Sequence, residues 1–152
     1  MEWHFERVAG PYGFTEGPVW NGEAVLFSDI PNSRILRYDP RTGECDEYRT
    51  RTNRANGLVL APDGGVYVCE TEGRRISHYG IDGDSRIVAE AFEGNRLNSP
   101  NDIVLDGEGR LWFTDPRYSA ERADMELDHE SVYRLAHRSD DTWAISRMTF
   151  DT

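Results

Sequence analysis

The chain has 152 residues, 38% of them hydrophobic and 30% charged, which suits one globular domain with a real core. It carries 28 acidic and 17 basic residues, for a net charge of -11. This balance argues against nucleic acid and against an anionic membrane surface as partners. The N-terminus lacks a signal-peptide pattern and no apolar run approaches the roughly 20 residues of a membrane span, so we expect a cytoplasmic protein. Cys45 and Cys69 have no metal-binding spacing, and we expect two reduced thiols.

The first predicted element is an edge strand over residues 3–8. After it the chain repeats itself three times. Each repeat begins with an oxygen-bearing side chain before an apolar strand, passes through a turn of Gly, Asn or Asp, and enters a second strand that ends in an acid. The repeats begin at Glu16, Asn56 and Asn101, which are 40 and 45 residues apart.

Two further apolar-alternating runs complete each repeat. Third strands are expected at 35–38, 76–79 and 132–135, and fourth strands at 45–49, 86–90 and 143–147. Four strands in about 40 to 50 residues are typical of one β-propeller blade. The sequence therefore predicts a single all-β domain over 1–152 with three blades, at about 14–50, 54–91 and 99–148, and few helices.

The repeat also predicts where polar side chains gather. Antiparallel neighbours place the start of the first strand and the end of the second on the same rim. That rim would carry Glu16, Asn56 and Asn101 at strand starts, and Asp29, Glu70 and Asp115 at strand ends. Such residues also cap strand ends by bonding backbone groups, and this interpretation stays open for Asp29, Glu70 and Asn56. A merely structural carboxylate is poorly suited to the apolar strand that Glu16 enters.

Four motifs carry a family resemblance. They are Glu16-Gly17-Pro18-Val19-Trp20, Phe27-Ser28-Asp29-Ile30, Asn98-Ser99-Pro100-Asn101-Asp102 and Phe113-Thr114-Asp115-Pro116. In this order they resemble the senescence marker protein/gluconolactonase/luciferin-regenerating-enzyme-like family. The resemblance runs from Phe14 to about Tyr118, and more faintly to the C-terminus.

The resemblance implies a six-bladed propeller with one divalent metal at its axis, most often Ca²⁺, with Zn²⁺ or Mg²⁺ in some members. It implies a hydrolase that acts on a sugar lactone or another small lactone. By motif, Glu16 matches the family's first-blade metal ligand, and Asn101 matches the third-blade asparagine that contacts metal or substrate. Carboxylate and amide oxygens are the ligands that hard cations take.

The family's remaining metal asparagine and its acidic ligand, the candidate general base, lie in the fourth and fifth blades, beyond the last residue of this chain. The catalytic base is therefore unassigned, and we expect half a propeller with half a site. Two explanations stay open, a fragment of a longer parent and a homodimer that completes a six-bladed ring. The functional alternative is a non-catalytic fragment or assembly module with a vestigial metal site.

Further substrate contacts are expected on the same rim, from Asn56, Arg96, Asn98, Asp115 and Arg117. Some relatives have an arginine two residues before the equivalent of Asn101, where this chain has Ser99. The long connection over 117–130 is expected either as a lid, with Arg117, Tyr118 or Arg122 at the substrate, or as a solvated loop. Core packing between blades is expected for Trp20, Phe27, Trp112 and Phe113.

Overall fold

The fold is taken from a computed structural model, which describes residues 2–118 and 122–150. Residues 119–121, part of the expected lid or loop, lie outside the described residues. All regular structure is β, apart from one turn of 3-10 helix, η1 (Ile30–Asn32), among the described residues. The all-β prediction is therefore confirmed.

Three four-stranded antiparallel sheets follow one another along the chain, each with its strands in sequence order. The first sheet consists of β1 (Thr15–Trp20), β2 (Val25–Asp29), β3 (Arg34–Tyr38) and β4 (Cys45–Thr50). The second consists of β5 (Ala55–Leu60), β6 (Val66–Glu70), β7 (Arg75–Tyr79) and β8 (Ser85–Ala89). The third consists of β11 (Ile103–Leu105), β12 (Leu111–Asp115), β13 (Ser131–His137) and β14 (Trp143–Arg147).

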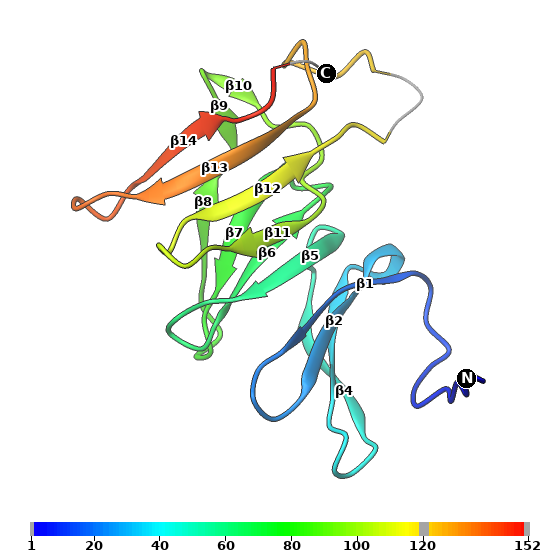
Figure 1. The fold of residues 1–152 in the computed structure, drawn as a ribbon. Helices are drawn as coiled ribbons and strands as arrows, with labels where there is room; N and C mark the ends of the chain where they lie inside the picture. The colour runs from blue at the N-terminus through cyan, green and yellow to red at the C-terminus, as the bar shows by residue number, and fades with distance from the viewer. Residues whose placement is uncertain (1, 119–121, 151–152) are drawn as a thin grey trace.

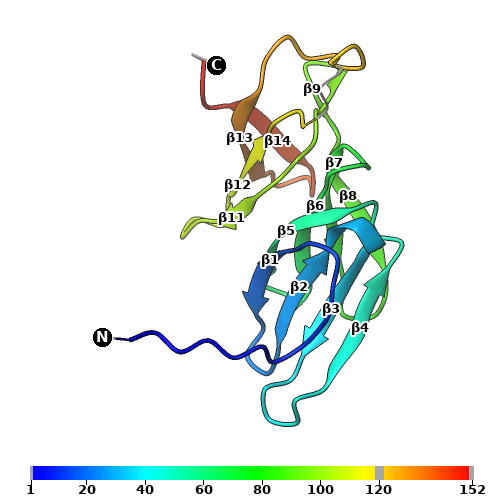
Figure 2. The same cartoon turned by 90° about the vertical axis from the view of Figure 1, so that its right-hand side faces the viewer.

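The sheets stack face to face around their first strands. β1 packs on β5, and β5 packs on β11, so the three first strands are neighbours (Figure 1). The fourth strands lie on the outside of the stack (Figures 1 and 2). This arrangement is consistent with a β-propeller-like fold, in which each meander is one blade.

Two apolar cores fill the spaces between sheets. Leu26 and Ile35 of the first sheet pack with Leu58 and Val68 of the second. A larger cluster between the second and third sheets contains fully buried side chains from both, among them Cys69, Ile76, Leu111, Tyr133 and Leu135. Burial of these side chains, at about 25 cal/mol per Å², is the main force that holds one sheet on the next.

The joints between the first strands need glycine. The Gly57 N–H donates to the Asn101 carbonyl at 2.8 Å, and a Cβ on Gly57 would lie 2.7 Å from that oxygen. Gly17 repeats this approach against the Asn56 carbonyl, with a positive φ of 58°. These contacts draw the polar residues at the strand starts close together.

Two local expectations are wrong, and one element was not expected. Residues 3–8 form no strand, because nothing among the described residues pairs with them, and Trp3 and Phe5 are 76% and 88% exposed. Trp20 is 52% exposed, since its neighbour Val19 faces the second sheet and alternate side chains point to opposite faces. A small hairpin, β9 (Ala91–Phe92) with β10 (Asn95–Arg96), was not predicted.

Phe27 and Trp112 also lie away from the cores between the sheets. The Phe27 ring packs on Tyr12 of the N-terminal segment, which runs along the outer side of the first sheet (Figure 2). The Trp112 indole donates to Asp106 Oδ2 at 2.8 Å. Of the four aromatic residues expected in the core, Phe113 is the one in an inter-sheet cluster, at 1% exposure.

The structure also bears on the cysteines and on membrane-spanning helices. Cys45 and Cys69 are both free thiols, as predicted. No helix within residues 2–118 and 122–150 has the length and hydropathy that a membrane crossing requires.

Candidate functional site

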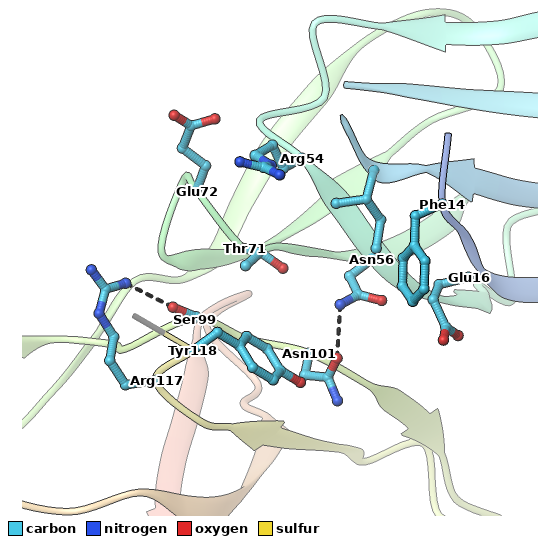
Figure 3. A pocket seen from close by; sticks show the side chains of 11 residues that line it. Phe14, Glu16, Arg54, Asn56, Thr71, Glu72, Ser99, Asn101, Arg117 and Tyr118 are labelled. Carbon is cyan, nitrogen blue, oxygen red and sulfur yellow. Dashed lines mark hydrogen bonds between the residues drawn. The ribbon is translucent and has the colours of Figure 1, made fainter. Parts of the chain in front are cut away.

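A pocket of about 700 Å³ opens where the first strands of the three sheets begin. The joints described above bring these strand starts together, so each sheet contributes to the wall (Figure 3). The lining residues include Phe14, Glu16, Arg54, Asn56, Ser99 and Asn101. The expected ring of side-chain oxygens at the three strand starts therefore lies around one pocket.

Glu16, Asn56 and Asn101 supply the oxygens at this centre. Asn56 Nδ2 donates to Asn101 Oδ1 at 2.7 Å, which fixes both amide groups across the joint between sheets. Glu16 is exposed, and its carboxylate accepts a long bond of 3.4 Å from its neighbour's backbone N–H. One carboxylate and two amides thus line the same end of the pocket (Figure 3).

Arg117 and Ser99 lie at the other side of the pocket, and the Tyr118 ring extends from there toward Asn101 (Figure 3). Arg117 Nη1 donates to Ser99 Oγ at 2.8 Å, and the same guanidinium pairs with Asp124. Arg117 thus brings a guanidinium to Ser99, the position two residues before Asn101. Burial raises the pKa of Tyr118. With Phe14, Tyr118 gives the pocket two aromatic surfaces.

Three predicted substrate contacts do not line this pocket. Arg96 lies on the β9–β10 hairpin, where its backbone N–H donates to Glu126 Oε2 at 2.7 Å. Asn98 is fully buried and donates to the backbone carbonyl of His129 at 2.9 Å. Asp115 is 1% exposed and lies behind the chain segment that carries Ser99 and Asn101.

The acids at the ends of β2 and β6 bind cations of the protein itself. Asp29 pairs with Arg34 at 2.9 Å, and Glu70 pairs with Arg75 at 2.9 Å. Burial alone would raise the pKa of Asp29, but hydrogen bonds from Asn32, Arg34 and the Gly13 N–H lower it below its ordinary value. Both acids therefore have a structural role, but only Asp29 fits the strand-capping interpretation, because it accepts the Gly13 N–H, whereas the hydrogen bonds of Glu70 come from side chains.

Sequence reasoning missed Phe14, Ile30, Arg54, Thr71 and Glu72 in the pocket wall. A signal for two of them was present in the repeat. Phe14 and Arg54 precede Glu16 and Asn56 by two residues, as Ser99 precedes Asn101. The residue two positions before each strand-start residue therefore also lines the pocket, although these three side chains differ in chemical type.

The donor set fits a hard divalent cation in kind but not in number. Carboxylate and amide oxygens suit Ca²⁺ or Mg²⁺, and Ca²⁺ takes six to eight of them. Within 2–118 and 122–150, no three His, Cys, Asp or Glu side chains form a metal-binding group. Glu16 with the two asparagines therefore supplies part of a coordination shell.

Comparison with known proteins gives the family. The model of the SMP-30/Gluconolactonase/LRE-like region matches residues 14–151. A gluconolactonase of Zymomonas mobilis is 30% identical over 152 residues, which cover 86% of this chain and 42% of that protein. The structure of a Xanthomonas campestris gluconolactonase has a TM-score of 0.84 at 30% identity, over 93% of this chain and 49% of that one.

A third likeness shows the fold alone. Regucalcin of Agrobacterium tumefaciens, described as a calcium-binding protein, has a TM-score of 0.66 at 17% identity, over 91% of this chain and 43% of that one. The chain thus spans less than half the length of these three relatives. Its matched residues, from 14 to 151, establish that the chain belongs to the SMP-30/gluconolactonase/LRE-like family.

Proposed function

We propose that this chain carries one side of the active site of a metal-dependent hydrolase that acts on a sugar lactone or another small lactone. The observation that supports this most is the pocket that gathers Glu16, Asn56 and Asn101 from three successive sheets. Membership of the family, and the gluconolactonases among its relatives, point to the reaction class. The two free thiols suit a reducing compartment such as the cytoplasm.

The proposal includes closure into a six-bladed propeller. The three sheets would be blades 1 to 3, at about 14–50, 54–91 and 99–148. The third sheet has an apolar groove of about 150 Å³ on its outer face, lined by Val104, Trp112 and Val132 among others. Further blades, from a longer chain or from a second copy, would cover this face and add the missing ligands.

Glu16 and Asn101 are the proposed metal ligands from this chain, with Ca²⁺ as the first choice and Zn²⁺ or Mg²⁺ as others. When bound, such a cation supplies Lewis-acid polarisation of a carbonyl oxygen. The bond from Asn56 holds the Asn101 amide in one orientation, which suits a fixed ligand or substrate contact. The general base is not assigned to any residue of this chain.

The remaining pocket residues would bind and orient the lactone. Arg117 is held by Asp124 and Ser99, so its planar donors are directed at a fixed place. Phe14 and Tyr118 offer apolar surface to the carbon face of a ring. Arg96, Asn98 and Asp115, which lie outside the pocket lining, would act on the substrate only through these residues.

Calcium titration followed by calorimetry tests the metal assignment. Glu16→Gln keeps the size of the side chain and removes its charge, so we expect calcium affinity to fall at least tenfold. The matched control is Glu108→Gln, because Glu108 lies on the far-rim turn and pairs with Arg110. Equal calcium affinity in wild type and Glu16→Gln would show that Glu16 is not a ligand.

A second measurement separates the two candidate functions. The non-catalytic alternative is favoured by the absence of a complete ligand group in the described residues. Hydrolysis of glucono-δ-lactone, followed by acid release with and without calcium, distinguishes them. Calcium-dependent turnover lost in Glu16→Gln supports the hydrolase. Calcium binding without turnover supports a binding module with a vestigial site only in an assembly that completes the ring, because the general base is not assigned to this chain.

A further inference from the structure

The acids that end the second strands are equivalent in the repeat, but their partners are not. All three are buried, at 0% exposure for the first and 1% for the other two. Each is paired across the sheet with the first residue of the third strand. These pairs are Asp29 with Arg34, Glu70 with Arg75, and Asp115 with Ser131. The third sheet therefore has the buried carboxyl without the arginine that neutralises it in the other two.

No cationic side chain among the described residues forms an ion pair with Asp115 in place of the missing arginine. Its Oδ2 accepts the Asn98 N–H at 2.8 Å. Its Oδ1, like Asn98 Oδ1, has no hydrogen-bond partner of normal geometry among the described residues. A buried acceptor without a partner is costly, and more so when it is charged.

The charged and titratable groups around Asp115 come from several elements. Burial raises its pKa from 3.8 to about 6, against the opposing effects of the Asn98 and Ser99 N–H groups, Arg74 and His129. The Arg74 guanidinium is occupied by the carbonyls of Leu97 and Asp124. The thiol of Cys69 and the hydroxyl of Tyr133 also lie near Asp115. The pKa of Tyr133 is raised mainly by burial and secondly by the charge of Asp115.

The carboxyl of Asp115 lies against the segment over residues 97–101, which forms one wall of the pocket. Ser99 and Asn101 in this segment line the pocket, yet the segment belongs to no strand. Its backbone is held by contacts from outside. The Arg74 guanidinium donates to the Leu97 carbonyl, and the Asp115 carboxyl accepts the Asn98 N–H. The Thr71 hydroxyl donates to the Pro100 carbonyl. The Asn101 N–H donates to the Thr114 carbonyl, and the Asn101 carbonyl accepts the Gly57 N–H.

We propose that Asp115 is a positioning residue of segment 97–101, and that this wall of the pocket is held most firmly while the Asp115 carboxyl carries a proton, because an ionised carboxylate would leave its buried Oδ1 without a partner. The proposal goes beyond the lactonase function, because it concerns the pocket wall whichever ligand the pocket takes. A buried acid whose pKa is raised in the folded protein stabilises the native arrangement fully below its ordinary pKa. That contribution is lost as the pH rises through about 6.

Amide hydrogen exchange of the full chain, measured by NMR from pH 5 to pH 8, tests this. The amides of Asn98 and Asn101 report opening of the segment, and Val68 in the buried strand β6 reports the core. After correction for intrinsic exchange, we expect protection at Asn98 and Asn101 to fall by about tenfold over this range, because much of the change between the ordinary and the raised pKa of Asp115 lies below pH 5. Protection at Val68 should fall much less. A parallel fall at Val68 would make the effect global and overturn the positioning role.

Three variants identify the group that titrates. Asp115→Asn should abolish the pH dependence, whereas a merely structural side chain would change the level of protection and leave the dependence. Ser131→Arg restores the pairing of the other two sheets and should move the titration below pH 5. His129→Gln is the control for the nearby imidazole and should leave the titration near pH 6.

The proposal fails if wild-type protection at Asn98 is flat from pH 5 to 8, or if the dependence persists in Asp115→Asn. It also fails if His129→Gln removes the dependence. Should either Asp115→Asn or Ser131→Arg fail to fold, the comparison of wild type with His129→Gln still decides.

Discussion

Among single residues, arginine neutralises two of the buried acids in this protein, Asp29 and Glu70, by forming ion pairs with them. Asp29 is fully buried, and the Arg34 guanidinium that pairs with it at 2.9 Å is 28% exposed. Breaking such a pair by removing one partner leaves the other charge buried without compensation. Asp29 and its arginine therefore offer a direct test of how much this pairing contributes to the first sheet.

Arg34→Ala should lower the free energy of unfolding at pH 7 by about 1–3 kcal/mol, less than for a fully buried pair because Arg34 is 28% exposed. The pKa of Asp29 is below its ordinary value in the folded protein. Its contribution is therefore present at neutral pH and is lost as the pH falls through that lowered pKa. The deficit of the variant should consequently shrink in acid. Urea denaturation at pH 7 and at pH 3, which is below the ordinary pKa of 3.8, measures both effects.

Arg41→Ala is the matched control, because Arg41 is 65% exposed and pairs with Asp39 in a turn. Surface pairs contribute little to stability, so the unfolding curve should stay where the wild-type curve lies. If Arg41→Ala costs as much as Arg34→Ala, or if the Arg34→Ala deficit is the same at both pH values, the buried-charge argument is wrong.

The repeat in the sequence predicted the positions of some site residues correctly and not of others. The repeat alone placed Glu16, Asn56 and Asn101 around one centre, because strand period and antiparallel order fix which rim a strand start lies on. It did not separate Asp115 from the pocket. Whether an acid at a strand end faces a pocket or the protein interior depends on the chain that passes over it, here residues 97–101, and that path has no periodic signal.

At the scale of elements, the joints between first strands decide where the pocket is. A Cβ on Gly57 would lie 2.7 Å from both the Asn101 carbonyl oxygen and the Asp102 Cα. Both are backbone atoms that cannot rotate away. Gly57→Ala should therefore push β5 from β11 and destabilise the fold by about 2–3 kcal/mol. Urea denaturation followed by tryptophan fluorescence measures the loss.

Gly107→Ala serves as the control, since a Cβ there meets nothing within 4 Å. It should be neutral or slightly stabilising, because alanine reduces the freedom of the unfolded chain. Equal losses in the two variants would mean that glycine is needed for flexibility and not for close approach of β5 to β11.

Element boundaries were predictable where the pattern is local. The four-strand meanders follow from alternation and from turn residues such as Asp63, whose Oδ1 accepts the Gly65 N–H at 3.0 Å. The edge strand over residues 3–8 was not predictable in the same way. Alternation gives a segment the capacity to be a strand, but a neighbour must supply the hydrogen bonds, and residues 2–118 and 122–150 contain none for it.

At the scale of the whole molecule, the two ends of the stack are not equivalent. The outer face of the first sheet is partly covered by the N-terminal segment, where Tyr12 packs on Phe27. The outer face of the third sheet carries Val104, 56% exposed, beside its apolar groove. Exposed apolar surface that a neighbouring blade would cover favours association. We therefore expect self-association to occur through the outer face of the third sheet.

Val104→Asp should reduce that association, because it places a charge in the apolar groove of a protein whose net charge is already -11. Light scattering at rising protein concentration, with and without calcium, measures the mass. We expect the wild-type mass to rise with concentration and the variant to stay close to a monomer. Ile81→Asp is the control, since Ile81 is 73% exposed but lies outside this groove.

The pattern of masses then distinguishes the ways in which the propeller would be completed. A discrete wild-type dimer that calcium favours, and that Val104→Asp dissociates, supports two copies closing one ring, because the site would gain ligands from both. Association without a fixed stoichiometry supports a face that belongs against further blades of a longer protein. Equal effects of Val104→Asp and Ile81→Asp would show that added charge, and not the groove on the third sheet, controls association.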